Sequence, residues 1–266
     1  MSEEEIGGIT ECCIDGVVVT AELLSAYLRS WARHGVYFET RHARQPDRLA
    51  GDDPVVGARI VYHDVLTYRF SHGHPDRAKR GKLNEEFLHP AAFEGEIFPK
   101  DASTDPLYPV VVFPVSRVYP TERLTLQRFL DKLALFLSRL PSGYRYALGV
   151  QNSEYLLPAY FDCLREYSVA HTFCASKTMP GLLDQAQLPY ALTADVAVVV
   201  TEPSVNVECQ LGIMEIVRRC VDAKKELYVC LEAVPERQTI PFLAVLMERM
   251  SGDLAKLSPI RATKAA

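Results

Sequence analysis

The feature that most constrains the fold is a regular alternation of short apolar runs and longer amphipathic stretches from about residue 108 onward. The run 108–115 (YPVVVFPV) is rich in β-branched residues, as is typical of a parallel strand that is buried on both faces. The stretch 121–140 follows with apolar residues at three- and four-residue steps. This spacing predicts an amphipathic helix that Thr121 caps and Pro141 ends.

The same strand–helix cycle recurs four more times in the second half of the chain. The predicted strands are 144–150, 169–175, 194–200 and 226–231, and the predicted helices are 157–167, 179–187, 206–225 and 240–252. Short links between such units require parallel strands joined by helical crossovers.

The N-terminal half follows this rhythm less regularly. Three further strands are predicted at 9–14, 36–41 and 58–65. One helix is predicted over 20–35, between Thr20 as cap and Gly35 as stop, and a second within 84–98, broken by Pro90. Eight strands with interleaved helices predict an α/β fold, a (β/α)8 TIM-type barrel that is irregular in its N-terminal half. An open, doubly wound sheet is the alternative.

Composition sets limits on location and function. The formal net charge of −5 and the pI near 5.8 argue against a general nucleic-acid binder. Seven cysteines without a CxxC pair favour reduced thiols in a cytoplasmic protein. The acidic start, MSEEEIGG, has no signal-peptide core, and no apolar run reaches the ~18 residues of a membrane span. No linker divides the chain, so we expect one domain over 1–266.

In a barrel, functional groups gather at the carboxyl ends of the strands. The catalytic candidates at these positions are Glu39, His63, Asn152 and Glu232, and the ligand-binding candidates are Arg41, His42, Gln151 and Lys177. Imidazole and carboxylate groups suit zinc, manganese or iron, but these residues have no fixed metal-ligand spacing. Solvated or structural roles are therefore favoured, and no metal or cofactor is predicted.

The segment 70–82 (FSHGHPDRAKRGK) allows three interpretations. His72 and His74 form an HxH pair, which in some barrels binds a metal. The basic run that includes Arg77 and Arg80 could instead hold a phosphate-bearing ligand or an acidic partner, and Arg80 is the ligand-binding candidate. A solvated loop is the favoured interpretation.

The stretch from about 83 to 232 resembles the YecE-like family, also called domain of unknown function 72. The matching segments are FLHPAAF, VVVFPV, LTLQRFLDKLALFLSRLPSGYRYALGVQN, YFDCLREYSVAHTF, KTMP and LTADVAVVV. The first eighty residues fit more loosely, through LLSAYLRSWARHG and GARIVYHDV. The resemblance implies a (β/α)8 type of barrel and implies no particular reaction.

The strand ends depart from what this resemblance implies. The family's fifth strand ends in Glu–hydrophobic–Arg; Gly149 and Gln151 stand in those places here, followed by the retained Asn152. The other replaced positions are Tyr37 and Glu39 for Glu and Asn, His63 for Lys, Val112 for Gln, Cys174 for Asn, and Glu232–Ala233 for paired Asn.

A barrel that keeps its hydrophobic pattern while its strand-end groups change favours a non-catalytic role, as a binding or structural subunit in an assembly. The alternative is an enzyme for a small polar or phosphorylated substrate at the barrel mouth, with or without a metal. A live site would bring Glu39, His63 and Glu232 together in a pocket. A structural role would fill the mouth and expose an apolar patch elsewhere.

Overall fold

The structure is a computed structural model. It describes residues 11–14, 17–20, 31–32, 35–41, 58–90, 110–119, 124–202, 206–232, 242–243, 245–246 and 249–250.

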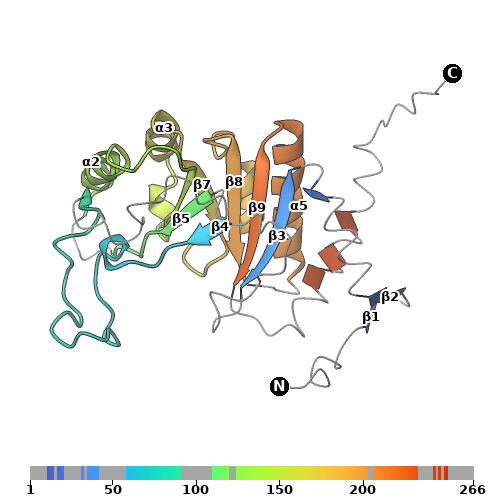
Figure 1. The fold of residues 1–266 in the computed structure, drawn as a ribbon, viewed down its shortest axis with the longest axis horizontal. Coiled ribbons are helices and arrows are strands. Elements are labelled where there is room, and N and C mark those ends of the chain that lie inside the picture. Colours follow the sequence, from blue (N-terminus) through green and yellow to red (C-terminus); the bar gives the residue numbers. More distant parts are fainter. Residues whose placement is uncertain are drawn as a thin grey trace.

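A parallel sheet in the order β3-β9-β8-β7-β6-β5-β4 forms the centre of the molecule (Figure 1). Its strands are β3 (Val36–Arg41), β4 (Ala58–Ile60), β5 (Val110–Pro114), β6 (Tyr146–Gly149), β7 (Ala170–Cys174), β8 (Val196–Thr201) and β9 (Glu226–Glu232). Every neighbouring pair in this order is parallel. The predicted strands from residue 108 onward are therefore confirmed, as is the strand at 36–41.

The sheet curls, with β3 and β4 as its two end strands. The pairing of β3, the first strand of the sheet along the chain, with β9, the last one, is the pairing that starts to close a (β/α)8 barrel. The α/β class and the barrel-like curl are thus confirmed. Within the described residues, however, the sheet has seven strands rather than eight and does not close.

The two faces of the sheet bury different side chains. One face packs against the helices through large residues such as Phe113, Leu148 and Phe173. The inner face of the curl carries a second, smaller apolar cluster from six strands, built from Ala58, Ile60, Val110, Val112, Ala147, Ala170, Val196, Val198, Tyr228 and Cys230. Small side chains on this face allow the strands to curl without leaving a cavity.

Four described helices connect the strands: α2 (Leu126–Leu137), α3 (Pro158–Glu166), α4 (Leu182–Gln187) and α5 (Val207–Asp222). In Figure 1, α2, α3 and α5 lie on the outside of the curl. Thr125, and not the predicted Thr121, caps α2, since its hydroxyl accepts a hydrogen bond from the Arg128 N–H at 3.3 Å. Asn206 caps α5 by accepting from the Glu208 N–H at 2.9 Å.

The prediction of the first barrel strand at 9–14 is wrong. Residues 11–14 form β1 (Glu11–Ile14), which pairs antiparallel with β2 (Val17–Thr20) in a separate two-stranded sheet. Two short strand segments, the second of them entirely β-branched, separated by the Asp15–Gly16 dipeptide are a hairpin signal, and this signal outweighs the barrel rhythm. Thr20, the predicted cap of the helix over 20–35, is the last residue of β2; residues 31 and 32 are helical, and most of that predicted helix lies outside the described residues.

The predicted strand at 58–65 is shorter than expected. It ends at Ile60, and a 3-10 helix, η2 (Asp64–Leu66), follows. The His63 side chain caps this helix by accepting a hydrogen bond from the Val65 N–H at 3.1 Å, which turns the chain out of the sheet. Residues 85–88, within the segment predicted as the start of a helix, instead form turns.

A polar contact reaches across the inner face at the amino ends of the strands. Arg145, directly before β6, pairs with Glu226 of β9 at 2.8 Å, and its guanidinium also donates to the Tyr228 hydroxyl at 3.1 Å. Tyr228 stacks on Tyr37 of β3 with 5.0 Å between ring centroids. Two strands that are not neighbours in the sheet are thereby linked, which favours the curl.

Two composition-based expectations bear on the described part of the chain. The described cysteines Cys163, Cys174, Cys209, Cys220 and Cys230 take no part in a disulfide. Among the described residues, none of the helices has the length and apolar character needed to cross a membrane.

Gly212 gives a direct test of the helix packing. A Cβ atom at this position of α5 would lie 2.5 Å from Leu182 Cβ and 2.6 Å from the Leu183 backbone nitrogen. Alanine normally stabilises a helix relative to glycine, but here it would push α4 away. We expect Gly212→Ala to lower the free energy of unfolding by about 1–3 kcal/mol in urea denaturation. Gly73→Ala, whose added Cβ meets only Ser71 Oγ at 3.9 Å, is the control and should change stability by less than about 0.5 kcal/mol.

Candidate functional site

The parallel order places the carboxyl ends of all seven strands along one edge, here called the strand-end edge. The last strand residues along it are Arg41, Glu232, Thr201, Cys174, Gly149, Pro114 and Ile60. This is the edge at which a barrel enzyme carries its catalytic groups.

Three predicted site positions are neighbours in the β3–β9 pair. Arg41 pairs with Glu232 in the strand register, and Glu39 pairs with Cys230. Alternation along β3 puts positions 39 and 41 on the face of Tyr37. The side chains of Glu39, Arg41 and Glu232 lie outside the described part, and so does all of His42.

His63 lies after β4, and its side chain already has a local role. Its Nδ1 accepts the Val65 N–H at the start of η2. The backbone that follows is held from two sides, since Leu88 N–H donates to Val65 O at 2.8 Å and Ser116 N–H donates to Leu66 O at 2.9 Å. His63 therefore helps to join the loops that follow β4 and β5.

Asn152 is buried, with 2% of its surface exposed, and hydrogen bonds occupy its amide. Its Oδ1 accepts the Val118 N–H at 2.8 Å, and its Nδ2 donates to Val118 O at 2.8 Å and to Glu154 Oε1 at 2.7 Å. The amide thus mimics a strand partner for Val118 and ties the loop after β5 to the loop after β6. This arrangement is a structural clamp.

Gln151 and Lys177 are both exposed at this edge. The Thr178 hydroxyl donates to the Gln151 backbone oxygen at 2.9 Å, so the loops after β6 and β7 are adjacent. Arg80 lies elsewhere, in the loop after η2, where its Nε donates to His74 O at 2.7 Å. The structure therefore brings Gln151 and the Lys177–Thr178 loop together, and it places Arg80 with the basic loop.

Side chains from β7 fill the space beside the end of β6. A Cβ atom at Gly149 would lie 3.0 Å from Cys174 Sγ and 3.3 Å from Thr172 Cβ. Cys174 is itself fixed, because its N–H donates to Gln185 Oε1 at 3.3 Å and Gln185 Nε2 donates to its carbonyl at 2.9 Å. Gln185 is fully buried and also donates to Pro180 O at 2.7 Å. A larger side chain at 149 would have to displace this packing.

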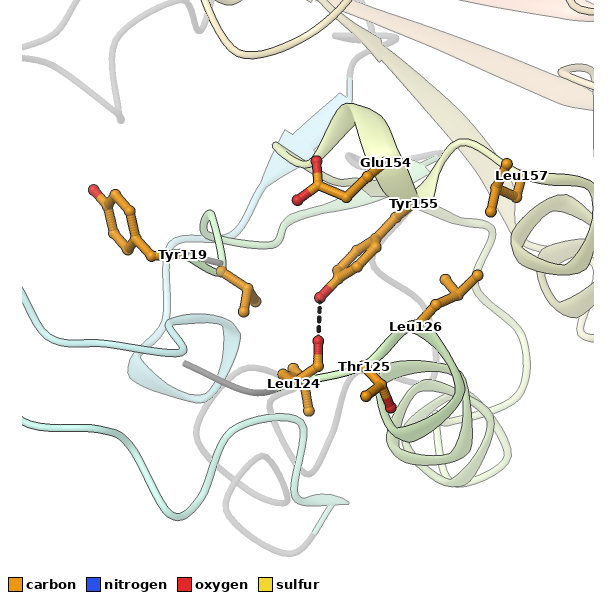
Figure 2. A pocket seen from close by; sticks show the side chains of 8 residues that line it. Tyr119, Leu124, Thr125, Leu126, Glu154, Tyr155 and Leu157 are labelled. Atoms are coloured by element: carbon orange, nitrogen blue, oxygen red, sulfur yellow. Dashed lines mark hydrogen bonds between the residues drawn. The ribbon is translucent and has the colours of Figure 1, made fainter. Parts of the chain in front are cut away.

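A shallow pocket of about 380 Å³ lies beside the loops that follow β5 and β6 (Figure 2). It is lined by Val118, Tyr119, Leu124, Thr125, Leu126, Glu154, Tyr155 and Leu157. Tyr155 stiffens its floor by donating to Leu124 O at 3.0 Å and by stacking on Phe129 at 4.7 Å. Glu154 is the charged lining residue, and the rest of the wall is mostly apolar. Such a surface suits binding more than acid–base chemistry.

The part of the chain that the structure describes contains no group of three or more His, Cys, Asp or Glu side chains able to hold a metal ion. The two rings of the HxH pair, His72 and His74, have different neighbours. His74 Nε2 lies 3.2 Å from Asp64 Oδ1, whereas the His72 ring faces Gly81.

Sequence reasoning did not single out His171, which is fully buried on the helix-covered face of β7. Its Nδ1 lies 3.3 Å from the Tyr160 hydroxyl, and its ring packs edge-on against Phe161 and Phe173. Its Nε2 has no hydrogen-bond partner among the described residues. Burial in this aromatic surrounding lowers the pKa of His171 from 6.5 to about 3, so the ring is neutral at physiological pH. In the sequence, its burial is indicated by its position within the mostly apolar strand segment VAHTFCA.

Comparison with solved structures finds a similar fold in a DUF72 family protein. The chain is similar to a DUF72 family protein from Thermotoga maritima MSB8, with a TM-score of 0.50, 13% identity, and coverage of 83% of this chain and 87% of that one. It also matches a DUF72 family protein from Enterococcus faecalis V583, with a TM-score of 0.42, 12% identity, and coverage of 86% and 94%.

No protein-family model matches the sequence, and no curated protein matches it either. The resemblance to the YecE-like family predicted from the sequence is confirmed at the level of the fold, on the Thermotoga structure.

Asn152 separates a structural from a catalytic role. Asn152→Ala would leave the N–H and C=O of Val118 without these partners, so we expect the free energy of unfolding to fall by about 2–4 kcal/mol. Gln151→Ala, at the exposed neighbouring position, should change it by less than about 0.5 kcal/mol. An Asn152→Ala protein of wild-type stability in urea titration would contradict the clamp.

His171 predicts a pH dependence of stability. Between its folded pKa of about 3 and its unfolded value of 6.5, the unfolded chain binds one more proton at this position. The stabilisation is therefore complete above pH 6.5 and falls by up to about 1.4 kcal/mol per unit as the pH drops below it. His171→Phe keeps the ring packing and removes the titration, so between pH 6.5 and 5 its stability should fall less steeply than that of the wild type. Equal slopes in urea titrations would contradict the assignment.

Proposed function

We propose that the chain is a diverged, single-domain member of the YecE-like (DUF72) family that has lost its strand-end chemistry. It acts in the cytoplasm as a binding or structural subunit of a larger assembly. In this sense the protein is a pseudoenzyme that requires no cofactor.

The packing at Gly149 is the observation that carries the proposal. The family resemblance implies Glu at this position and Asn at the position of Cys174. Here Cys174 Sγ and Thr172 Cβ lie 3.0 and 3.3 Å from where a Cβ of residue 149 would be, so any side chain at this position would have to shift both of them. The two replacements complement each other, because the sulfur fills space next to a missing side chain. A site that is refilled in this way is adapted to packing rather than to acid–base catalysis.

The polar groups that remain support the same reading. Asn152 clamps Val118, His63 caps η2, and Gln185 holds Cys174. A catalytic amide or imidazole needs a free atom directed at the substrate. In Asn152 and Gln185 both the oxygen and the nitrogen of the amide are hydrogen-bonded within the protein, and in His63 the Nδ1 atom is.

The surface beside the strand-end edge offers a place for a partner. Tyr119 and Leu157 border the pocket and are 50% and 47% exposed. Large apolar side chains around one pocket, with a single carboxylate from Glu154 among them, resemble the mixed surface of a protein-binding site.

The β3–β9 pair favours a second candidate function. Arg41 and Glu232 are register partners, and Glu39 is two positions away on the same face. This half of the edge could serve an enzyme acting on a small polar or phosphorylated substrate, with Gln151, Lys177 and His42 as further ligands and with or without a bound metal. The enzyme alternative requires the side chains at this half of the edge to bind a ligand. The proposal assigns them no ligand.

A double variant distinguishes the two. His63→Asn keeps an acceptor for the Val65 N–H, and Glu232→Gln removes the carboxylate. In the protein isolated gently from its own cells, we expect the double variant to retain the sedimentation coefficient and the protein composition of the wild-type assembly. Gly149→Glu should instead reduce the folded yield, because it disturbs the packing against Cys174.

The enzyme alternative predicts the opposite pattern. If the wild-type chain carries a stoichiometric small molecule or metal that the double variant lacks, the strand-end edge is a live site and the proposal is wrong.

A further inference from the structure

The loop between Arg69 and Leu83, here called the basic arm, is a fixed structure rather than a loose loop. An antiparallel bridge joins Arg69 to Leu83 at its base. Next to it, Phe70 N–H donates to Lys82 O at 3.0 Å and Gly81 N–H donates to Phe70 O at 3.1 Å. Gly81 has a φ of +67°, a conformation that glycine adopts without strain.

An ion-pair cluster fixes the base of the arm from the inside. The Asp64 carboxylate accepts from Lys79 Nζ at 2.6 Å and lies 3.2 Å from His74 Nε2. Partial burial acts to raise the pKa of Asp64, but these hydrogen bonds and charges lower it below its usual value, so Asp64 stays ionised. Phe70 is buried between the His74 ring and the Lys79 ammonium, at 4.9 and 5.2 Å from its centroid. Asp64 therefore balances the charge of Lys79.

The outer cations of the arm have no such balance. Its fifteen residues contain five Lys or Arg and one acidic residue, Asp76, which amounts to a formal charge of +4 in a chain of −5. Arg77, Arg80 and Lys82 are exposed and make no ion pair with the described residues. The Arg80 guanidinium is oriented through its Nε, which donates to His74 O at 2.7 Å. The arm thus presents three exposed positive charges, one of them oriented by a hydrogen bond, on an otherwise acidic protein.

We propose that the basic arm is a docking site for a short acidic segment of a partner protein, whose carboxylates pair with Arg77, Arg80 and Lys82. Arginine guanidinium groups hold carboxylates with two parallel hydrogen bonds, and a preformed arm loses little conformational freedom on binding. None of the contacts that fix the arm involves the last residues of the strands along the strand-end edge, so the proposal stands whether or not that edge is catalytic.

The charge distribution favours an acidic peptide over a nucleic acid. Nucleic-acid binding requires a basic track that follows many successive phosphates, and the residues outside the arm together carry a formal charge of −9. Single strands also need exposed aromatic rings for base stacking, whereas Phe70, the aromatic ring of the arm, is 6% exposed. A short acidic segment bound to the arm requires neither a long basic track nor exposed aromatic rings.

The test compares two variants of equal net charge. Arg77→Gln, Arg80→Gln and Lys82→Gln together neutralise the arm, and Arg128→Gln, Arg139→Gln and Lys224→Gln neutralise exposed cations elsewhere. The probe is a fluorescein-labelled peptide of twelve glutamates, and its binding to the full chain is followed by fluorescence anisotropy at 50 mM NaCl. A single-stranded RNA of twelve uridines, labelled in the same way, serves as the competing class.

We expect the arm variant to bind the glutamate peptide at least tenfold more weakly than the wild type, and the control variant to change the affinity less than twofold. The wild-type affinity should fall as NaCl is raised to 200 mM. If the wild type does not bind the peptide, if both variants weaken binding equally, or if the RNA binds more tightly than the peptide, the proposal is overturned. Circular dichroism checks that both variants are folded. If the triple variant is not folded, the double variant Arg77→Gln with Lys82→Gln, which leaves the Arg80–His74 contact intact, repeats the test.

Discussion

The parallel pairing of the seven strands is the constraint on which the rest of the structure depends. Because every strand runs in the same direction, all carboxyl ends meet at one edge, and each connection must return over the outside of the curl. One face is then covered by helices, and the other turns inward and holds mostly small or aliphatic side chains together with the stacked rings of Tyr37 and Tyr228. The contact of Arg145 with Glu226 and Tyr228 spans that inner face and couples strands that are not neighbours.

Much of this fold could be predicted from the sequence, because the signals are local. The β-branched run at 110–114 and the helical spacing from Leu126 to Leu137 each specify their own element. The first sixty residues were harder, since 11–14 forms a hairpin with 17–20 where the barrel rhythm suggested a strand of the main sheet. The sequence pattern of a strand does not specify which strand it pairs with. Pairing depends on turns and on packing, which cannot be read from hydrophobic periodicity.

The location of the candidate site could be predicted for the same reason. Whether its side chains face a substrate or pack within the protein could not. Strand ends mark the positions of Gly149 and Asn152, but their roles depend on contacts across the sheet. Cys174 Sγ lies against Gly149 from the next strand, and Asn152 clamps Val118, which is 34 residues earlier. Likewise His63 was predicted as a catalytic candidate, and its Nδ1 caps η2. The resulting picture is a barrel-like scaffold whose edge is filled by its own side chains where β6 and β7 end, and whose basic arm carries a net positive charge on an otherwise acidic protein.

The central claim is that the strand-end edge is occupied by the protein's own side chains and serves no substrate. Native mass spectrometry of the wild-type complex, isolated gently from its own cells, tests it most directly. The account predicts a stoichiometric protein partner and, once that partner dissociates, a chain of 29.8 kDa without added mass. A chain found without a partner protein but with the extra mass of a metal ion or a small molecule would contradict it.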